Sequence, residues 1–243
     1  MKSSRLSRLR DALKARDWLG IGIEIVVVVL GVLIAFQIDQ WGARRKQADD
    51  ERQFLERLYR ENAQGAEELR AIIRQYDRLV FEVGTALRAQ AYPHRLRPYL
   101  AKPNFGCGIG ALPAATYNDT TSEELITAGR VSLITDRDLQ ADLRRLAASQ
   151  ARGVAELMST SARISDGTAA LDPYYRLNVD AENAPVCSID WIHLLADQRA
   201  VNAATRLLRR HVLTRQARMD TLAQSQRVQA RLACILAKPE CKR

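Results

Sequence analysis

The sequence predicts an all-α protein, in which a single N-terminal transmembrane helix precedes an elongated antiparallel helical bundle. Three observations support this fold class. A run of twenty residues near the N-terminus carries one charge, three later segments repeat apolar residues at helical spacing, and no segment shows convincing strand alternation with hairpin turns. We therefore divide the chain into a lead segment, 1–17, a membrane segment, 18–41, and a domain, 42–243.

The membrane segment reads WLGIGIEIVVVVLGVLIAFQIDQW, from Trp18 to Trp41. Twenty helical residues span roughly 30 Å, the thickness of a hydrocarbon core, and tryptophan rings favour the two membrane interfaces. The apolar run is too long for a cleaved signal peptide, and no small-x-small cleavage site follows it. The sequence therefore predicts an uncleaved signal anchor.

Basic residues set the expected orientation. Six Lys and Arg residues precede Trp18, and three form a cluster just after Trp41, at positions 44–46. Because basic residues stay on the cytoplasmic side, we expect the N-terminus in the cytoplasm and, in the inner membrane of a Gram-negative bacterium, the domain in the periplasm. The lead segment has leucines at helical spacing, which predicts a short amphipathic helix on the anionic inner leaflet; the alternative is a solvated basic tail.

One face of the membrane segment gathers its carboxyl group and its small residues. At 100° per residue, five positions fall within about 40° of one another. They are Gly20, Glu24, Val28, Gly31 and Ala35. Small residues let helices approach closely, and a carboxyl in a membrane prefers protein or water to lipid. This pattern predicts self-association or docking of another membrane protein; the alternative is that Glu24 extends to the cytoplasmic interface.

Three long helices are expected in the domain, at about 43–90, 136–172 and 190–237, the last restarting at Asp197. We expect Thr135 with Asp138 to open the second helix. The first carries an a/d heptad, and the inward residues of all three are expected to be apolar. They are Leu55, Leu58, Leu69, Ile72, Tyr76, Leu79, Val83 and Ala86, then Leu139, Leu143, Leu146, Leu157, Ile164 and Leu171, then Val201, Leu208, Val212, Met219, Leu222, Leu232 and Leu236.

Polar or small residues interrupt these inward stripes. They are Asn62 and Gly65, Gln150 and Gly153, and Gln226 and Gln229. Such layers line a ligand cavity or form a polar network; the alternative is an ordinary role in fixing the helix register. Residues 91–121 and 172–188, which separate the helices, are expected to be loops, with a short capped helix from Thr121 to Gly129 at the end of the first.

The four cysteines all lie in the domain: Cys107, Cys187, Cys234 and Cys241. In an oxidising compartment an even number predicts disulfides, with three possible pairings. Cys234 and Cys241 are close in sequence and easy to join, which leaves Cys107 with Cys187. A simple up–down–up bundle places the loops of Cys107 and Cys187 at opposite ends, which weighs against this pairing unless residues 91–121 fold back. A zinc site is disfavoured, because no C-x₂-C spacing occurs.

No residues are predicted to be catalytic, to bind a cofactor or to bind a metal. The formal net charge is +9, which suits anionic lipid or envelope polymers. We interpret Arg144-Arg145 and Arg209-Arg210-His211 as solvated helix faces. Basic residues are not interleaved with aromatic ones, so no nucleic-acid binding is expected.

Two stretches resemble a family of uncharacterised single-pass bacterial membrane proteins. The first is EIVVVVLGVLIAFQIDQW followed by QFLERLYRENAQGAEEL, which is similar to the family's Glu-containing span ending in Gly-hydrophobic-Ala-Leu-Gln-x-x-x-Trp and then a long helix; Phe36 replaces the usual Leu. The second is EELITAGRVSLITDRDLQADL, where the family pattern falls on Leu125, Gly129, Arg130, Ile134, Asp136 and Leu139. The resemblance implies the topology and fold, and no activity.

Three functions follow as hypotheses. The first is a periplasmic interaction or scaffold protein, self-associating through the span and the Leu55–Ala86 stripe. The second is a ligand-sensing helical bundle that signals to a separate membrane partner. An enzyme acting on envelope material is the least supported, because no catalytic grouping is visible.

Overall fold

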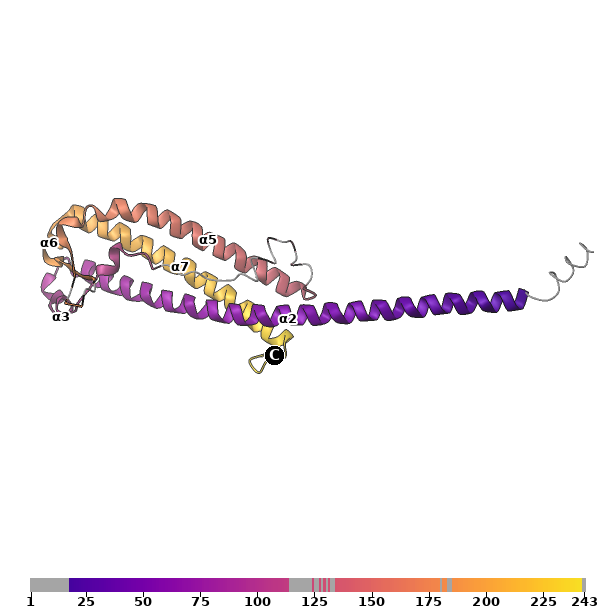
Figure 1. Cartoon of the computed structure of the whole chain (residues 1–243). Helices are drawn as coiled ribbons and strands as arrows, with labels where there is room; N and C mark the ends of the chain where they lie inside the picture. Colours follow the sequence, from indigo (N-terminus) through magenta and orange to yellow (C-terminus); the bar gives the residue numbers. More distant parts are fainter. Residues whose placement is uncertain are drawn as a thin grey trace, which may run out of the picture. The chain divides into compact units, whose positions relative to one another are not determined.

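The computed structural model is mostly helical (Figure 1). It describes residues 18–113, 134–179, 181–182 and 185–241, with positions 124, 127, 129 and 131. The elements are α2 (Trp18–Arg88), η1 (Pro93–Leu96), α3 (Arg97–Leu100), η2 (Cys107–Gly110), α5 (Arg137–Thr168), η4 (Asp172–Tyr174), β1 (Tyr175–Val179), β2 (Pro185–Ile189), α6 (Trp191–Ala196) and α7 (Gln198–Ile235). The lead segment and Thr121 lie outside the described residues. The chain divides into two compact units, Met1–Gln53 and Phe54–Arg243.

The first unit contains the apolar part of α2. The large apolar side chains described between Ile25 and Ile38 are all at least half exposed, as is that of Trp41. Among the described residues, α2 alone is long and apolar enough to cross a membrane, judged by length and composition. An apolar helix without protein cover is suited to a lipid environment.

The second unit has two apolar clusters, each built from α2, α5 and α7. The Leu58 cluster consists of Leu55, Leu58, Val131, Ile134, Leu139, Leu143, Leu146, Val228, Leu232 and Leu236. The Trp191 cluster consists of Leu79, Val83, Ala86, Ala89, Leu96, Phe105, Ile109, Ile164, Leu171, Ile189, Trp191, Leu194, Leu195, Ala200, Val201, Ala203, Ala204 and Leu207. All eight inward residues expected in the first helix are buried.

The two clusters also show in which direction each long helix runs. The start of α5 packs in the Leu58 cluster and its end in the Trp191 cluster, the same order as in α2, whereas α7 meets the clusters in the reverse order. This differs from a simple up–down–up order. The reason is that the chain passes from one cluster to the other between Ile109 and Val131, before α5 begins.

Two local expectations were wrong. Residues 172–188 are not only loop, because β1 and β2 form an antiparallel hairpin in which Tyr175 pairs with Ile189 and Val179 with Pro185. Its first strand alternates apolar and polar residues over only five positions, and Leu177 and Val179 are exposed, so the alternation does not mark a buried face. Also, the carboxylate of Asp136 caps α5 by accepting a hydrogen bond from the Leu139 N–H at 2.7 Å, one residue after the expected Thr135.

Candidate functional site

The five residues of the predicted membrane face all lie within α2, so their helical spacing holds. Val28 and Ala35 are exposed, and a Cβ atom added at Gly31 would meet nothing within 4 Å. Gly20 and Glu24 are helical in their backbone. The membrane face therefore remains a prediction. Those of its side chains that the structure describes are exposed.

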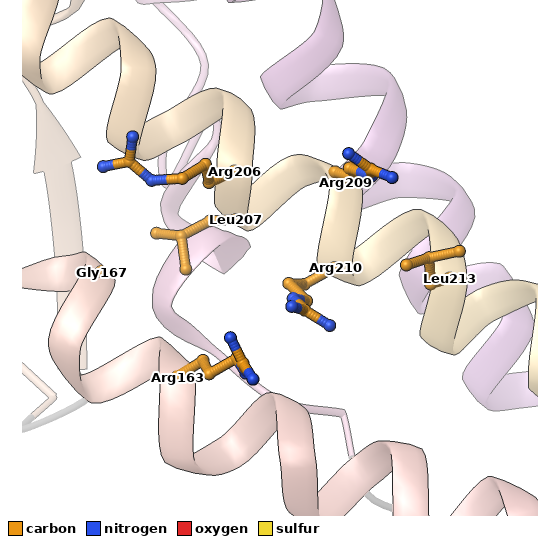
Figure 2. Close-up of a pocket in the computed structure, with 7 residues that line it drawn as sticks. All are labelled: Arg163, Gly167, Arg206, Leu207, Arg209, Arg210 and Leu213. Atoms are coloured by element: carbon orange, nitrogen blue, oxygen red, sulfur yellow. The ribbon is translucent and has the colours of Figure 1, made fainter.

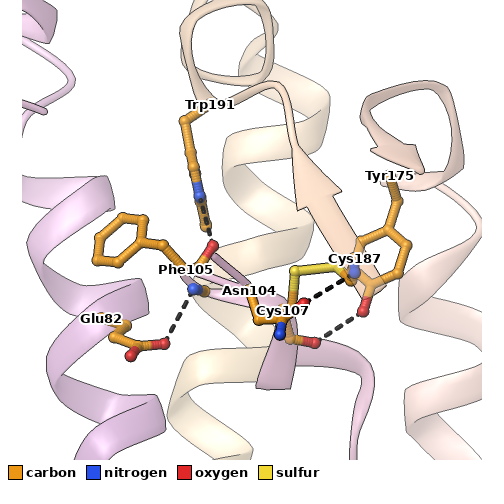
Figure 3. Close-up of a disulfide and its surroundings, with 8 residues drawn as sticks. Glu82, Asn104, Phe105, Cys107, Tyr175, Cys187 and Trp191 are labelled. Carbon is orange, nitrogen blue, oxygen red and sulfur yellow. Dashed lines mark hydrogen bonds between the residues drawn. A yellow bond between two sulfur atoms is a disulfide. The ribbon is translucent and has the colours of Figure 1, made fainter. Parts of the chain in front are cut away.

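The cysteines are paired as Cys107–Cys187 and Cys234–Cys241, with Cα atoms 6.0 Å and 4.6 Å apart. The first pair joins η2 to β2 beside the Trp191 cluster (Figure 3). It is possible because the chain stays at this cluster through Ile109 before it leaves for α5. Of residues 91–121, the described part from Leu96 to Ile109 lies at this cluster, as the pairing requires.

A close network holds the turn before Cys107 (Figure 3). The Cys187 N–H donates to the Asn104 side-chain oxygen at 2.8 Å, and the Tyr175 hydroxyl donates to the Cys107 carbonyl at 2.7 Å. A Cβ atom at Gly106, whose φ is +75°, would overlap the ring of Trp191. These contacts could not be predicted from the sequence, because they join residues about 70 to 85 positions apart.

The middle of α7 presents a polar face to the core. We call His211, Thr214, Arg218, Thr221 and Ser225 the polar section; all five are buried. The expected inward residues Val212 and Met219 are instead 41% and 37% exposed. The missed signal was spacing: steps of three and four residues continue from Leu207 through the polar section to Val228.

Most of the polar section is hydrogen bonded to the other long helices. The hydroxyls of Ser149 and Thr221 lie 3.0 Å apart, and those of Thr160 and Thr214 lie 3.2 Å apart. The Asn62 amide donates to the Ser225 carbonyl and to the Gln229 side chain, at 3.0 and 2.7 Å. Asn62 and Gln229 therefore take part in a polar network, one of the roles considered for the interrupting residues, whereas Gln226 is exposed.

Two members of the section are incompletely satisfied. Arg218 is 4% exposed, and its Nε and Nη2 atoms have no hydrogen-bond partner among the described residues. Gly153 lies beside it, since a Cβ atom there would be in ordinary contact with Nη1, at 3.6 Å. His211 Nε2–H donates to the Ile109 carbonyl at 2.8 Å, which leaves its buried Nδ1 without a described partner.

Burial also shifts the acidities in this section. It lowers the pKa of His211, and the hydrogen bond to Ile109 opposes this in part. Burial raises the pKa of Tyr76 to about 12, although the positive charge of Arg218 acts in the opposite direction. At neutral pH His211 and Tyr76, whose rings lie 6.1 Å apart, are therefore both neutral.

A cavity of about 540 Å³ opens between α5 and α7 (Figure 2). It is lined by Arg163, Gly167, Arg206, Leu207, Arg209, Arg210 and Leu213. In the close-up, the guanidinium groups of Arg163 and Arg210 point toward each other across the space between the helices. The interpretation of Arg209-Arg210-His211 as a solvated face was wrong for His211, which is buried. It was incomplete for Arg209 and Arg210, because both also line the cavity.

Comparisons with protein-family models, with curated proteins and with solved structures found no match to this chain. The candidate functional features of this chain are therefore the ones that its structure provides. They are an exposed apolar helix segment, a disulfide-joined turn, a buried polar section and an arginine-lined cavity.

Proposed function

We propose that this protein is anchored in the bacterial inner membrane by residues 18–41, with its N-terminus in the cytoplasm. Residues 42–243 then form a periplasmic, elongated helical bundle that acts by binding other proteins and by self-association, without catalysis. The observation that carries the proposal is the run of exposed apolar side chains from Ile25 to Ile38 in α2. Two cysteine pairs at disulfide distance are compatible with an oxidising compartment.

Self-association is assigned to the membrane face and not to the Leu55–Ala86 stripe. Every residue of that stripe is buried within the chain, and five of the eight pack in the two clusters with residues of α5 and α7, so the stripe is unavailable to a second copy. The open position at Gly31 supports close approach of another helix.

Cross-linking of the full chain in native membranes tests this proposal. Gly31→Leu should reduce the cross-linked dimer several-fold, because the new side chain stands where the partner helix would approach. It should not disturb the chain itself, since nothing lies within 4 Å of that position. Val27→Leu is the matched control, because Val27 is exposed but lies off the face. Equal dimer yields in both variants would remove the proposal of a membrane interface.

The topology has its own test. Alkaline phosphatase fused after Arg243 should be active, because this enzyme needs periplasmic disulfides, whereas a fluorescent protein fused before Met1 should mature in the cytoplasm. The reverse pattern would contradict the orientation without bearing on self-association.

The second candidate is a ligand-sensing bundle that signals to a separate membrane partner. The arginine-lined cavity and the buried polar section favour it, since a ligand between α5 and α7 would act on the two helices that the section joins. Ligand-dependent change in cross-linking of the full chain to co-purified membrane proteins would distinguish this candidate from a passive scaffold.

A further inference from the structure

The cavity between α5 and α7 is bounded along the helices by two contacts. At one end, the hydroxyls of Thr160 and Thr214 lie 3.2 Å apart. At the other, a Cβ atom at Gly167 would lie 2.8 Å from a methyl group of Leu207, so the absence of a side chain there lets the helices meet. Between these contacts the helices leave about 540 Å³. That volume is in the range of small-molecule sites, roughly 300–1,000 Å³.

The charge around this cavity is strongly unbalanced. Four of the seven lining residues are arginines. Arg163, Arg206 and Arg209 form no ion pair with a side chain that the structure describes, and Arg210 meets Glu156 only at 4.0 Å. Other arginines of the same helices are closely paired, as Arg145 is with Asp142 at 2.8 Å and Arg231 with Asp142 at 2.9 Å.

Guanidinium groups that face each other repel unless an anion lies between them. Arg163 and Arg210 approach from different helices, so one ligand can receive N–H groups from both (Figure 2). A phosphate group matches this arrangement, because its oxygens accept paired N–H bonds from arginine and it carries up to two charges. Leu207 and Leu213 give the cavity apolar wall as well.

We infer that this cavity binds a small organic phosphate, whose phosphate group lies between Arg163 and Arg210 and whose apolar part contacts Leu207 and Leu213. The inference goes beyond the proposed membrane association and does not depend on it. The same chemistry is offered by two sources, a soluble phosphate ester and the headgroup of an anionic phospholipid.

Calorimetric titration of the full-length protein in an uncharged detergent tests the site, with phenyl phosphate as the probe and phenol as its neutral match. Phenyl phosphate should bind saturably with one site per chain, and more weakly as salt rises, whereas phenol should not. Arg163→Gln combined with Arg210→Gln should weaken binding about tenfold or more, since each charged hydrogen bond contributes strongly to affinity.

The matched control is Arg152→Gln combined with Arg227→Gln. It also removes one exposed arginine from α5 and one from α7, but neither residue lines the cavity. The control should keep the affinity of the wild type within about twofold, and circular dichroism should show the same helix content in all three proteins. Absence of saturable binding by the wild type, or an equal loss in both double variants, would overturn the inference.

Lipid mass spectrometry of the same preparations separates the two sources. An anionic phospholipid retained by the wild type and the control, but lost from the Arg163/Arg210 variant, would identify the headgroup as the ligand. Equal lipid content in all three, with phenyl phosphate binding still dependent on Arg163 and Arg210, would identify a soluble ester.

Discussion

The Trp191 cluster and the polar section are both buried between α2, α5 and α7, yet their chemistry differs. Every member of the cluster is apolar, and every member of the section carries a polar side chain. Burial of apolar surface stabilises the fold by about 25 cal/mol per Å², whereas a buried polar group left unpaired costs about 1–3 kcal/mol. Similar burial therefore has opposite expected consequences in the two regions.

The difference separates the part of the fold that supplies stability from the part that limits it. Ser225 of the polar section is hydrogen bonded to Asn62 of α2, but Arg218 and His211 keep buried atoms without a described partner. We expect losses of stability from changes in the cluster, and gains from replacing Arg218. Variants at the Trp191 cluster and variants at the polar section test these two expectations separately.

The largest effect is expected from the disulfide beside the Trp191 cluster. Cys107→Ser with Cys187→Ser opens a link of sequence separation 80, whereas Cys234→Ser with Cys241→Ser opens one of separation 7. Chain entropy assigns them about 4.5 and about 2.4 kcal/mol of stability. Denaturant unfolding of the oxidised proteins should show the larger loss for the first pair. An equal or smaller loss for the first pair would mean that the Cys107–Cys187 link does not add the stability expected from its longer loop, because packing already holds the cluster.

Trp191→Ala should cost about 3–5 kcal/mol of unfolding free energy, because a large side chain is removed from a filled core. Trp191 is 1% exposed and packs against Gly106 and Phe105. Ile192→Ala is the control on the next residue, which is 51% exposed, and should cost less than about 1 kcal/mol. Thermal unfolding measures both. Similar losses would show that the cluster tolerates a cavity and is not the stabilising region.

Arg218→Met should stabilise the protein, by about 1–4 kcal/mol, because it replaces a buried and incompletely bonded charge with an apolar chain of similar length. Asn62→Ala, on α2 beside the same section, should destabilise it by about 1–3 kcal/mol, since it removes the hydrogen bonds that Asn62 makes with Ser225 and Gln229. Chemical denaturation of the two variants gives the signs. Destabilisation by Arg218→Met would show that the guanidinium has a stabilising role in the core.

The sequence was sufficient for the elements whose signal is periodic. The run from Leu19 to Ile38 and the inward stripe from Leu55 to Ala86 depend only on local spacing, and the stripe is buried as expected. The start of α5 was misplaced by one residue, because Thr135 and Asp136 are both good capping residues and only the structure shows which side chain accepts the hydrogen bond from the Leu139 N–H.

The rest depended on contacts between distant residues. The first strand of the hairpin alternates apolar and polar residues over only five positions with Leu177 and Val179 exposed, and the hairpin is completed only by pairing of β1 with β2. The polar face of α7 was missed because apolar residues were used to phase the helix, and Val212 and Met219 are on its outer side. The arginine-lined cavity joins α5 to α7 across more than 40 residues, which no local pattern records.

The smallest effect concerns pH and again separates the polar section from the cluster. Burial lowers the folded-state pKa of His211 below its ordinary 6.5, so the unfolded chain binds a proton at this residue before the folded chain does. Stability should therefore fall as pH decreases through about 6.5, with a slope of at most about 1.4 kcal/mol per pH unit. Tyr76, whose ring lies 6.1 Å from that of His211, does not titrate there, because burial raises its pKa to about 12. His211→Gln, whose amide still donates to the Ile109 carbonyl, should reduce this slope between pH 7.5 and 5.5, while Ile192→Ala in the neighbourhood of the cluster should leave it unchanged. Unfolding curves at several pH values measure the slopes, and an unaltered slope in His211→Gln would place the pH dependence outside the polar section.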